Sequence, residues 1–442
     1  MERLKQAAAY TLQALKAAGA DDAQVSCAEG KAEEFNVDAG EFSLIRSVYS
    51  ASASMKVIKG RKKGTAAVNQ LDKEAIDIAV AECIAAADSG VEDDALSIAA
   101  LEENADFKEG SLVCDKAAFF DSVIRLTEDI KREYPQIMIE QLIATHSYGK
   151  HVVANTNGVL FTEEDGSYNV SVMYSAHDGE NATSFNYFDY DFLDPRTDII
   201  ALEGVRTMLD RAVAELATKP FTGKFVGTAV FSPACLGDFL GIITGSFTGD
   251  IALIEGTSPW KNKLGEKVAD ERVTVSVIPH DPRIVCGERI TSDGYRSEDF
   301  DIIKNGVLNS FCLSEYAANK TGLARAKSTS GCIGVAPGEQ SLDELIAGIE
   351  KGILVCRFSG GEPANNGDFS GVAKNSFLIE NGKITCPVSE TMISGNMAEM
   401  LFHLRGVSAE TVCDGASVLP YAAFDGVTVS GGATDEAPSE EG

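Results

Sequence analysis

Hydrophobic and polar positions follow two different periods along the first quarter of the chain. Residues 2–18 place apolar side chains every three or four positions and stop at Gly19, which predicts an amphipathic helix. Shorter segments in which apolar and polar residues alternate follow, and they predict strands at 23–28, 33–37, 43–49, 52–58 and 64–67. A second helix is predicted at 71–87, and a polar, acidic connector at 91–110.

The same order of patterns recurs in the next hundred residues. A helix is predicted at 116–133 and another at 199–216. Between them lie alternating segments that predict strands, which are 136–147, 151–155, 159–163, 167–174 and 182–190. The repeat indicates either an internal duplication, with halves of about 1–90 and 111–218, or one sheet built from two similar halves. Residue identity between the halves is slight, so both interpretations stay open.

After a linker at 219–224 the pattern becomes rich in strands. Strands are predicted at 225–231, 271–278, 300–303, 307–312 and 353–357. Ser341 and Glu344 form a capping-box pattern, which predicts a helix at 341–351. Asn381-Gly382 between the apolar runs 376–380 and 383–388 predicts a hairpin, because both turn residues tolerate positive φ.

Together these patterns predict an α+β fold. The N-terminal domain, 1–218, would hold an antiparallel sheet with flanking helices, and a β-rich C-terminal domain would occupy 222–431. The acidic tail at 432–442 is expected to be disordered, since it has little apolar surface to bury.

Composition narrows the class of partner. The formal net charge of −29 would repel nucleic acids and anionic membranes, so neither is an expected partner. The first residues lack an uninterrupted apolar core, and no run reaches the length of a membrane span, so a cytoplasmic protein is expected. The ten cysteines are scattered without a CxxC pair, which is typical of reduced thiols rather than a zinc knuckle or a redox dithiol.

The sequence fits neither of two known catalytic patterns well, the zinc-peptidase motif and the SxxK motif of serine enzymes. Zinc peptidases need histidines about one helical turn apart with a glutamate, and no HExxH or HExxxH occurs. His146 and His151 are five apart around Gly149, in an expected hairpin turn, so structural roles are favoured. Ser258 and Lys261 fit SxxK, but Pro259 disfavours the long helix that serine enzymes of this type place there. A serine hydrolase using Ser258 and Lys261 is therefore an unfavoured alternative.

Several longer motifs occur in one order along the second half of the chain. They are 263–268 (KLGEKV), 291–297 (TSDGYRS), 304–308 (KNGVL), 316–322 (YAANKTG) and 365–396, which contains the hairpin. In these motifs the chain resembles the TldD/PmbA family of bacterial and archaeal peptidase subunits, also labelled modulators of DNA gyrase. The resemblance covers about residues 3–431.

The resemblance implies which branch the chain belongs to. TldD-like members carry HExxxH on the helix after the first strand of the C-terminal domain, with a later cysteine as a further zinc ligand. PmbA (TldE)-like members lack the histidines and pair with a TldD-like subunit. Here the equivalent helix is 234–245, where Gly241 and Ile242 stand at the first His and the Glu, and Ser246 at the second His. Cys413 falls near the cysteine ligand, with a buried thiol as the alternative interpretation.

The resemblance therefore implies a chain without a catalytic residue, zinc or another cofactor of its own. Zinc is expected in a TldD-like partner in a heterodimer, and a homodimer of the isolated chain is left open. This chain would help to enclose and hold an unfolded peptide, for example by strand addition. Candidate contacts are polar residues expected in turns, namely Asn366, Asp368, Ser370, Ser394 and Asn396. Each of them has turn formation as its alternative role, and a non-enzymatic peptide- or protein-binding modulator is the alternative function.

Overall fold

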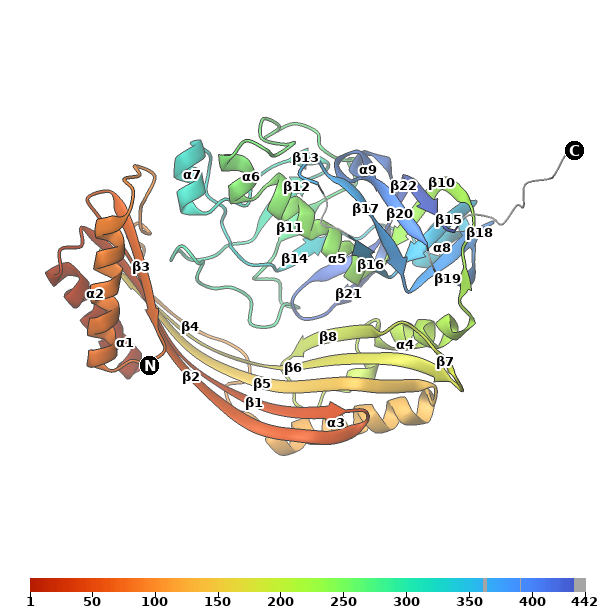
Figure 1. The fold of residues 1–442 in the computed structure, drawn as a ribbon, viewed down its shortest axis with the longest axis horizontal. Helices are drawn as coiled ribbons and strands as arrows, with labels where there is room; N and C mark the ends of the chain where they lie inside the picture. Colours follow the sequence, from red (N-terminus) through yellow and green to blue (C-terminus); the bar gives the residue numbers. More distant parts are fainter. Residues whose placement is uncertain (361–363, 390, 433–442) are drawn as a thin grey trace, which may run out of the picture.

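The computed structural model describes residues 1–360, 364–389 and 391–432. The chain forms two sheet-based parts, a long curved antiparallel sheet and a β-rich part that lies on its concave side (Figure 1). This arrangement confirms the predicted α+β class. All of the predicted acidic tail except residue 432 lies outside the described residues.

The first half of the N-terminal sheet is built from long strands. Its elements are α1 (Glu2–Ala17), β1 (Asp22–Asp38), β2 (Glu41–Lys59), β3 (Lys62–Val68) and α2 (Lys73–Ser89). The prediction of short segments was wrong because Gly30 does not end a strand. It lies in mid-strand opposite Ser50 and Gly149, where a Cβ would come within 2.7 Å of the Ser50 Oγ atom. Gly30 therefore allows close packing inside a continuous strand.

The second half repeats this order. Its elements are β4 (Ala105–Lys108), α3 (Lys116–Glu133), β5 (Ile137–Asn155), β6 (Leu160–Asp178), β7 (Asn181–Ala182), β8 (Asn186–Phe192), η1 (Ile199–Ala201), α4 (Val205–Ala214) and η2 (Glu215–Ala217). The predicted helix at 199–216 is broken at Gly204, whose φ of 84° is left-handed. The hairpin turn expected at Gly149 was also wrong, since His146 and His151 both lie inside β5.

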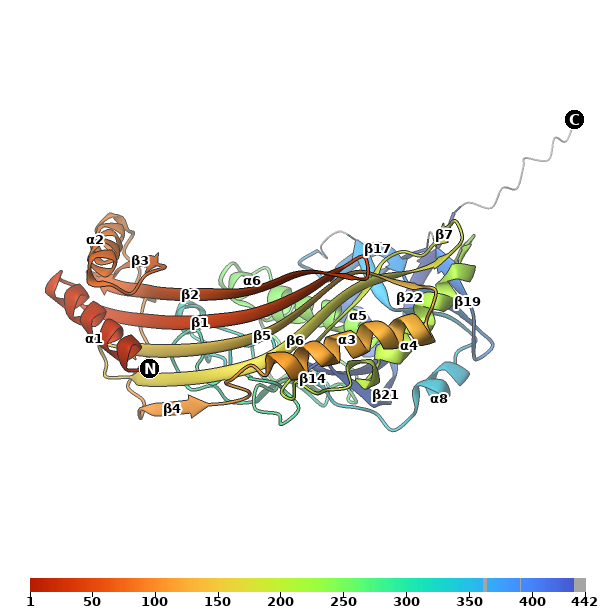
Figure 2. The ribbon, with the colours of Figure 1, turned by 90° about the horizontal axis from the view of Figure 1, so that it is seen from below.

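The strands form one sheet in the order β3-β2-β1-β5-β6-β4, and β8 also pairs with β6. β1 and β5 are antiparallel neighbours at its centre, and each half adds a meander on its own side. Whether the halves arose by duplication stays a prediction. Helices α3 and α4 pack on one face of the sheet, and the opposite face curves toward the C-terminal part (Figures 1 and 2).

The C-terminal part is a second, larger sheet with short helices. Its strands are β9 (Lys219–Pro220), β10 (Lys224–Phe231), β11 (Val275–Val277), β12 (Phe300–Lys304), β13 (Val307–Leu308), β14 (Ile333–Val335), β15 (Lys351–Val355), β16 (Arg357–Gly360), β17 (Asp368–Lys374), β18 (Ser376–Glu380), β19 (Lys383–Ser389), β20 (Met392–Asn396), β21 (Leu404–Cys413) and β22 (Val418–Ser430). Its helical elements are α5 (Pro233–Ile242), η3 (Ile243–Phe247), α6 (Asp250–Ile254), α7 (Glu315–Thr321), α8 (Leu342–Ala347), α9 (Met397–Met400) and η4 (Leu401–His403).

Two local predictions for this part are confirmed. Asn381 and Gly382 have φ of 49° and 75° and connect β18 to β19 through the pair Glu380 and Lys383. Ser341 and Glu344 form the capping box of α8, although the helix ends earlier than predicted, at Ala347.

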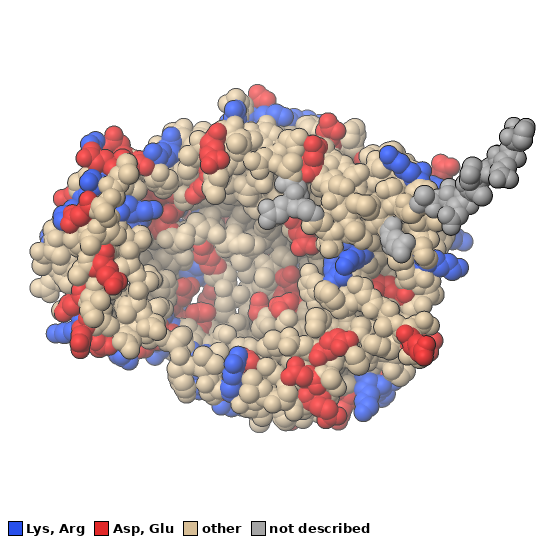
Figure 3. Space-filling model, in the orientation of Figure 1, with Lys and Arg blue, Asp and Glu red and all other residues tan. Residues whose placement is uncertain are grey.

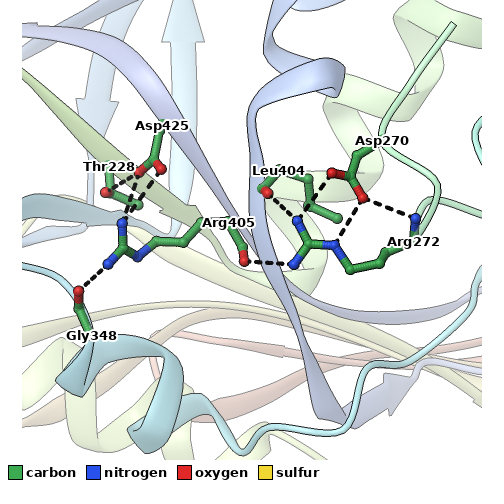
Figure 4. A network of polar contacts seen from close by, with 7 residues as sticks. All are labelled: Thr228, Asp270, Arg272, Gly348, Leu404, Arg405 and Asp425. Carbon is green, nitrogen blue, oxygen red and sulfur yellow. Dashed lines mark hydrogen bonds and ion pairs between the residues drawn. The ribbon is translucent and has the colours of Figure 1, made fainter.

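Two arginines fix the start of β21, where the pairing with β22 shifts register (Figure 4). Arg272 donates to the carbonyl oxygens of Leu404 at 2.5 Å and Arg405 at 3.0 Å, and it pairs with Asp270. Arg405 donates to Asp425 and to the carbonyl oxygen of Gly348. These charged hydrogen bonds satisfy carbonyl groups next to the point where the register shifts.

The two parts leave a hollow between them. The space-filling surface is recessed where the concave side of the N-terminal sheet meets the C-terminal part, and Asp and Glu side chains lie within the recess (Figure 3). The described residues include no helix that is both long enough and apolar enough to cross a membrane.

Candidate functional site

Helix α5 borders the hollow and carries the positions singled out in the sequence. Ser232 caps it by accepting from the Cys235 backbone N–H, and Pro233 occupies its first turn. One face packs into the core through residues such as Phe239, which is 1% exposed. The opposite face is an exposed stripe formed by Ala234, Asp238, Gly241 and Gly245.

The helix continues as a π-helical turn, η3, at the position of the expected zinc motif. The Thr248 N–H donates to the Ile243 carbonyl oxygen at 3.0 Å, an i to i+5 bond. A π-turn brings residues five apart toward one side of the helix, which is the spacing of Gly241 and Ser246. The π-turn thus coincides with the positions that the resemblance aligns with HExxxH, but their side chains are not usual zinc ligands.

The side chains present do not fit a zinc ion. A Cβ on Gly241 or Gly245 would meet nothing within 4 Å, so this face of the helix is open. Gly241 and Ile242 offer no ligand atom, and Ser246 offers only a neutral hydroxyl. Within the described ranges no three His, Cys, Asp or Glu side chains gather as metal ligands.

Cys413 is engaged elsewhere. Its Sγ atom lies 3.5 Å from the Arg283 carbonyl oxygen, and its backbone N–H donates to Glu203 at 3.0 Å. Burial raises the pKa of its thiol, which disfavours the thiolate that a metal would need. Cys413 is thus a half-buried thiol with these partners, and which of its two interpretations holds stays a prediction.

A cavity of about 190 Å³ lies where α4 and β8 meet the C-terminal part. Its lining includes Arg211, Glu215, Asp238, Arg357 and Tyr421, which come from five separate elements or connections. Asp238 also belongs to the exposed stripe of α5, so the cavity opens beside the degenerate zinc position.

Glu215 is a buried acid at the edge of this cavity, 6% exposed. Its Oε2 atom accepts from Asn375 at 2.7 Å and from Asn186 at 3.4 Å. Burial raises the pKa of Glu215 to about 7, against the lowering effect of the two amides. A carboxyl group that changes protonation near neutral pH therefore lies between the two parts of the chain.

The sequence analysis missed Arg211, Glu215 and Arg357 as site residues. They are far apart in the chain and no short motif joins them, so only the packing of α4 against β22 and against Cys356, between β15 and β16, brings them together. A single local signal existed, since Glu215 stands among apolar residues at the end of a helical pattern.

The five peptide-contact candidates form one polar cluster, but not at this cavity. Asp368 pairs across the strands with Asn396, and Ser370 with Ser394. Asn396 and Asn366 each donate to the Asp368 carboxylate at 2.8 Å, and these bonds lower the pKa of Asp368. Asn366 lies in a turn, as expected. The expectation of turn positions was wrong for the other four candidates, which lie in β17 and β20.

This cluster faces away from α5. Phe369, between Asp368 and Ser370 in β17, packs against Phe239 of α5 with ring centroids 5.0 Å apart. Because neighbours in a strand point to opposite faces, Asp368 and Ser370 point to the other side of the sheet. None of the five lines the interdomain cavity, and their role in peptide binding stays a prediction.

The remaining candidates have structural partners. Ser258 Oγ donates to the Phe247 carbonyl oxygen at 2.6 Å, while Lys261 Nζ donates to the Gly256 carbonyl oxygen at 2.9 Å. Neither arrangement activates a nucleophile, because the lysine does not take the serine proton. His146 bonds the Ser111 carbonyl oxygen at 2.7 Å, and His151 bonds Ser26 at 2.6 Å.

Comparison with known proteins gives one family throughout. Residues 222–431 match the model of the PmbA/TldA metallopeptidase C-terminal domain. A metalloprotease of Methanothermobacter thermautotrophicus is 31% identical over 208 residues, which is 44% of this chain and 45% of that protein. Metalloprotease PmbA of Escherichia coli O157:H7 is 32% identical over 36% of this chain and 37% of its own length. The alignments thus span less than half of these two relatives.

Other similarities run along the whole chain. The PmbA homologue of Haemophilus influenzae is 25% identical over 92% of this chain and 91% of its own. The fold matches TldE from Thermococcus kodakarensis with a TM-score of 0.80 at 20% identity, covering 96% of this chain and all of that one (100%). It also matches a putative modulator of DNA gyrase from Bacteroides thetaiotaomicron with a TM-score of 0.81 at 23% identity, over 97% and 98% of the two chains.

Proposed function

The chain belongs to the TldD/PmbA family, and from this premise we propose that it is a metal-free, PmbA (TldE)-like subunit of a cytoplasmic metallopeptidase. It helps to enclose an unfolded peptide, and a TldD-like partner supplies zinc and the hydrolytic chemistry. The observation that carries this proposal is helix α5. Its backbone keeps a π-turn at the motif, while Gly241, Ile242 and Ser246 hold no ligand and leave the helix face open.

An open helix face beside a cleft suits an extended peptide. With no side chain at Gly241 and Gly245, a peptide backbone can approach the helix closely. The acidic charge of the chain supports a peptide rather than a nucleic acid as the ligand, since −29 repels phosphate backbones.

A surface for the partner lies on β2. β3 pairs only with Ala53–Lys59 of β2, so the outer edge of residues 41–52 has no strand partner among the described residues. The same stretch exposes large apolar side chains, which are Phe42, Leu44, Ile45, Val48 and Tyr49. Such an edge is a template for pairing with another strand. It carries only Glu41 and Arg46 as charges, so two acidic subunits can approach along it with little repulsion.

We assign this edge to a strand of the TldD-like subunit. Ile45→Lys with Val48→Lys should abolish copurification of a TldD-like subunit of the same organism, because it places charge at a desolvated strand edge. Ile251→Lys is the matched control, since Ile251 on α6 is exposed to a similar degree. Unchanged copurification of the β2 variant would refute the assignment, and a homodimer that dissociates instead would show that the edge joins two copies of this chain.

The function is tested by mixing purified subunits. Hydrolysis of an end-labelled unfolded peptide should require both chains, and this chain alone should bind the peptide without cleaving it. Cleavage by the isolated chain would contradict the proposal, and its loss in Ser258→Ala would then identify the serine alternative. Peptide or protein capture that never leads to cleavage, even with the partner present, would favour the non-enzymatic modulator as the alternative function.

A further inference from the structure

We propose that the interdomain cavity binds the C-terminal residue of the peptide, with Arg211 contacting the free α-carboxylate. Arg357 and four acids also line the cavity, and apolar walls receive the last side chain. The inference rests on the proposed peptide-binding function and names the end of the peptide that this chain holds.

Arg211 is a cation without an anionic partner. Its Nη1 atom donates to Tyr421 Oη at 3.1 Å and approaches Cys356 Sγ at 3.8 Å, and both partners are neutral groups. No carboxylate lies within 4.0 Å of its guanidinium in the part of the chain that the structure describes. Most arginines of this acidic protein do have such a partner, for example Arg272 with Asp270 at 2.8 Å. A half-buried guanidinium with free donors facing a cavity is suited to bind a carboxylate in a bidentate manner.

Arg357, like Arg211, is a cation with no carboxylate within 4.0 Å among the described residues. Its Nη2 atom donates to Ser184 Oγ at 3.1 Å, and its guanidinium lies over the ring of Phe185 at 4.2 Å. Its Nε atom is buried without a hydrogen-bond partner. An orphaned buried donor is costly, which favours a ligand or a water molecule that supplies the missing acceptor.

The four acids that line the cavity form no ion pair within 4.0 Å with Arg211 or Arg357 among the described residues. The Asp414 carboxylate accepts from the backbone N–H groups of Ala416 at 2.9 Å and Ser417 at 2.6 Å. Asp189 accepts from Asn169 at 2.8 Å. Glu215 accepts from two amides, and burial raises the pKa of both Glu215 and Asp238. No carboxylate among the described residues comes within 4.0 Å of Arg211, so its remaining donors are available to a ligand.

The size and walls of the cavity select the ligand. Met208, Phe188, Val412 and Leu419 provide apolar lining. The volume of about 190 Å³ lies below the range of about 300–1,000 Å³ for pockets that hold drug-sized ligands. It is therefore suited to one residue rather than a whole peptide. Asp238 at the cavity mouth is followed one helical turn later by Gly241, so the preceding residues of the peptide would lie along the open face of α5.

The test compares two forms of one peptide. A fluorescently labelled, unstructured decapeptide ending in leucine is titrated with the full chain by anisotropy, once with a free C-terminus and once as the C-terminal amide. The free acid should bind about tenfold more tightly, the ratio that corresponds to about 1.4 kcal/mol. Arg211→Gln should remove this preference by weakening the free acid far more than the amide. Arg125→Gln is the matched control, since Arg125 on α3 also lacks a carboxylate partner but bonds Ser122 away from the cavity.

If Arg211→Gln does not fold, Arg357→Gln provides a second test. Arg357 is half-exposed and so tolerates exchange, and its substitution should also weaken the preference for the free acid. Equal binding of the acid and the amide by the unaltered chain would overturn the C-terminal anchor while leaving peptide binding intact. Binding of neither form, with or without the partner, would instead count against the proposed function itself. Retention of the preference in both arginine variants would place the carboxylate site elsewhere.

Discussion

The buried acid Glu215 makes stability depend on pH in a predictable direction. Burial raises its pKa to about 7 in the folded chain from the ordinary glutamate value of 4.5. The folded protein thus holds this proton more tightly than the unfolded chain does. The contribution to stability is fully present below pH 4.5 and is lost as the pH rises toward 7.

The magnitude follows from the shift. The rise of the Glu215 pKa from 4.5 to about 7 corresponds to about 3 kcal/mol at high pH. Between pH 5 and pH 8 the change is about 2–3 kcal/mol, because part of the effect lies below pH 5. Glu215→Gln removes the titration and keeps an oxygen that accepts from Asn375 and Asn186.

The assay is the free energy of unfolding in urea, measured from pH 5 to pH 8. Relative to Glu215→Gln, the unaltered chain should lose about 2–3 kcal/mol over this range, so the variant becomes the more stable protein at pH 8. Glu82→Gln controls for removing an exposed carboxylate, since Glu82 lies on the solvent side of α2. Parallel curves for the unaltered chain and Glu215→Gln would refute the reasoning that burial dominates the protonation of this group.

Three further predictions concern the scaffold around the site. Phe239→Ala should cost about 3–5 kcal/mol of unfolding free energy in urea, because Phe239 packs between Phe231, Phe358 and Phe369; a cost below 1 kcal/mol would show that α5 is not held by this cluster. Gly64→Ala should cost about 1–3 kcal/mol in thermal unfolding, since its Cβ would lie 2.0 Å from the Cys83 carbonyl oxygen. Gly241→Ala should be neutral or stabilising, because a Cβ there meets nothing within 4 Å. Equal effects of the two substitutions on stability would contradict the packing of α2 against Gly64. Arg272→Ala should cost about 1 kcal/mol and increase hydrogen exchange at the start of β21, because the carbonyl oxygens of Leu404 and Arg405 lose their donor; unchanged exchange there would show that these bonds do not fix the strand.

Local sequence signals predicted the elements of the fold more reliably than their lengths. The Asn381-Gly382 turn and the Ser341 capping box are complete within a few residues, so their structure could be read directly. Helix α3 also agrees with its predicted range, because its apolar positions repeat without a break. Strand lengths failed where glycine was read as punctuation, since Gly30 and Gly149 face each other inside a sheet rather than ending strands.

The candidate site shows where sequence reasoning stops. Alignment with a known motif located Gly241, Ile242 and Ser246, because the motif is contiguous. The cavity could not be found in that way, because Arg211, Glu215 and Arg357 meet only when the two parts of the chain pack together. The polar residues of 366–396 cluster around Asp368, yet alternation along β17 directs that cluster away from α5, so their role in peptide binding stays a prediction.

The zinc content of the purified protein tests the central claim most directly. It should be measured per chain by elemental analysis, for the isolated chain after incubation with excess zinc and dialysis, and for its complex with a TldD-like subunit. The account predicts almost no zinc on the isolated chain and about one ion per pair of chains in the complex. One tightly held zinc ion on the isolated chain, lost in Cys413→Ser or His146→Ala, would contradict it.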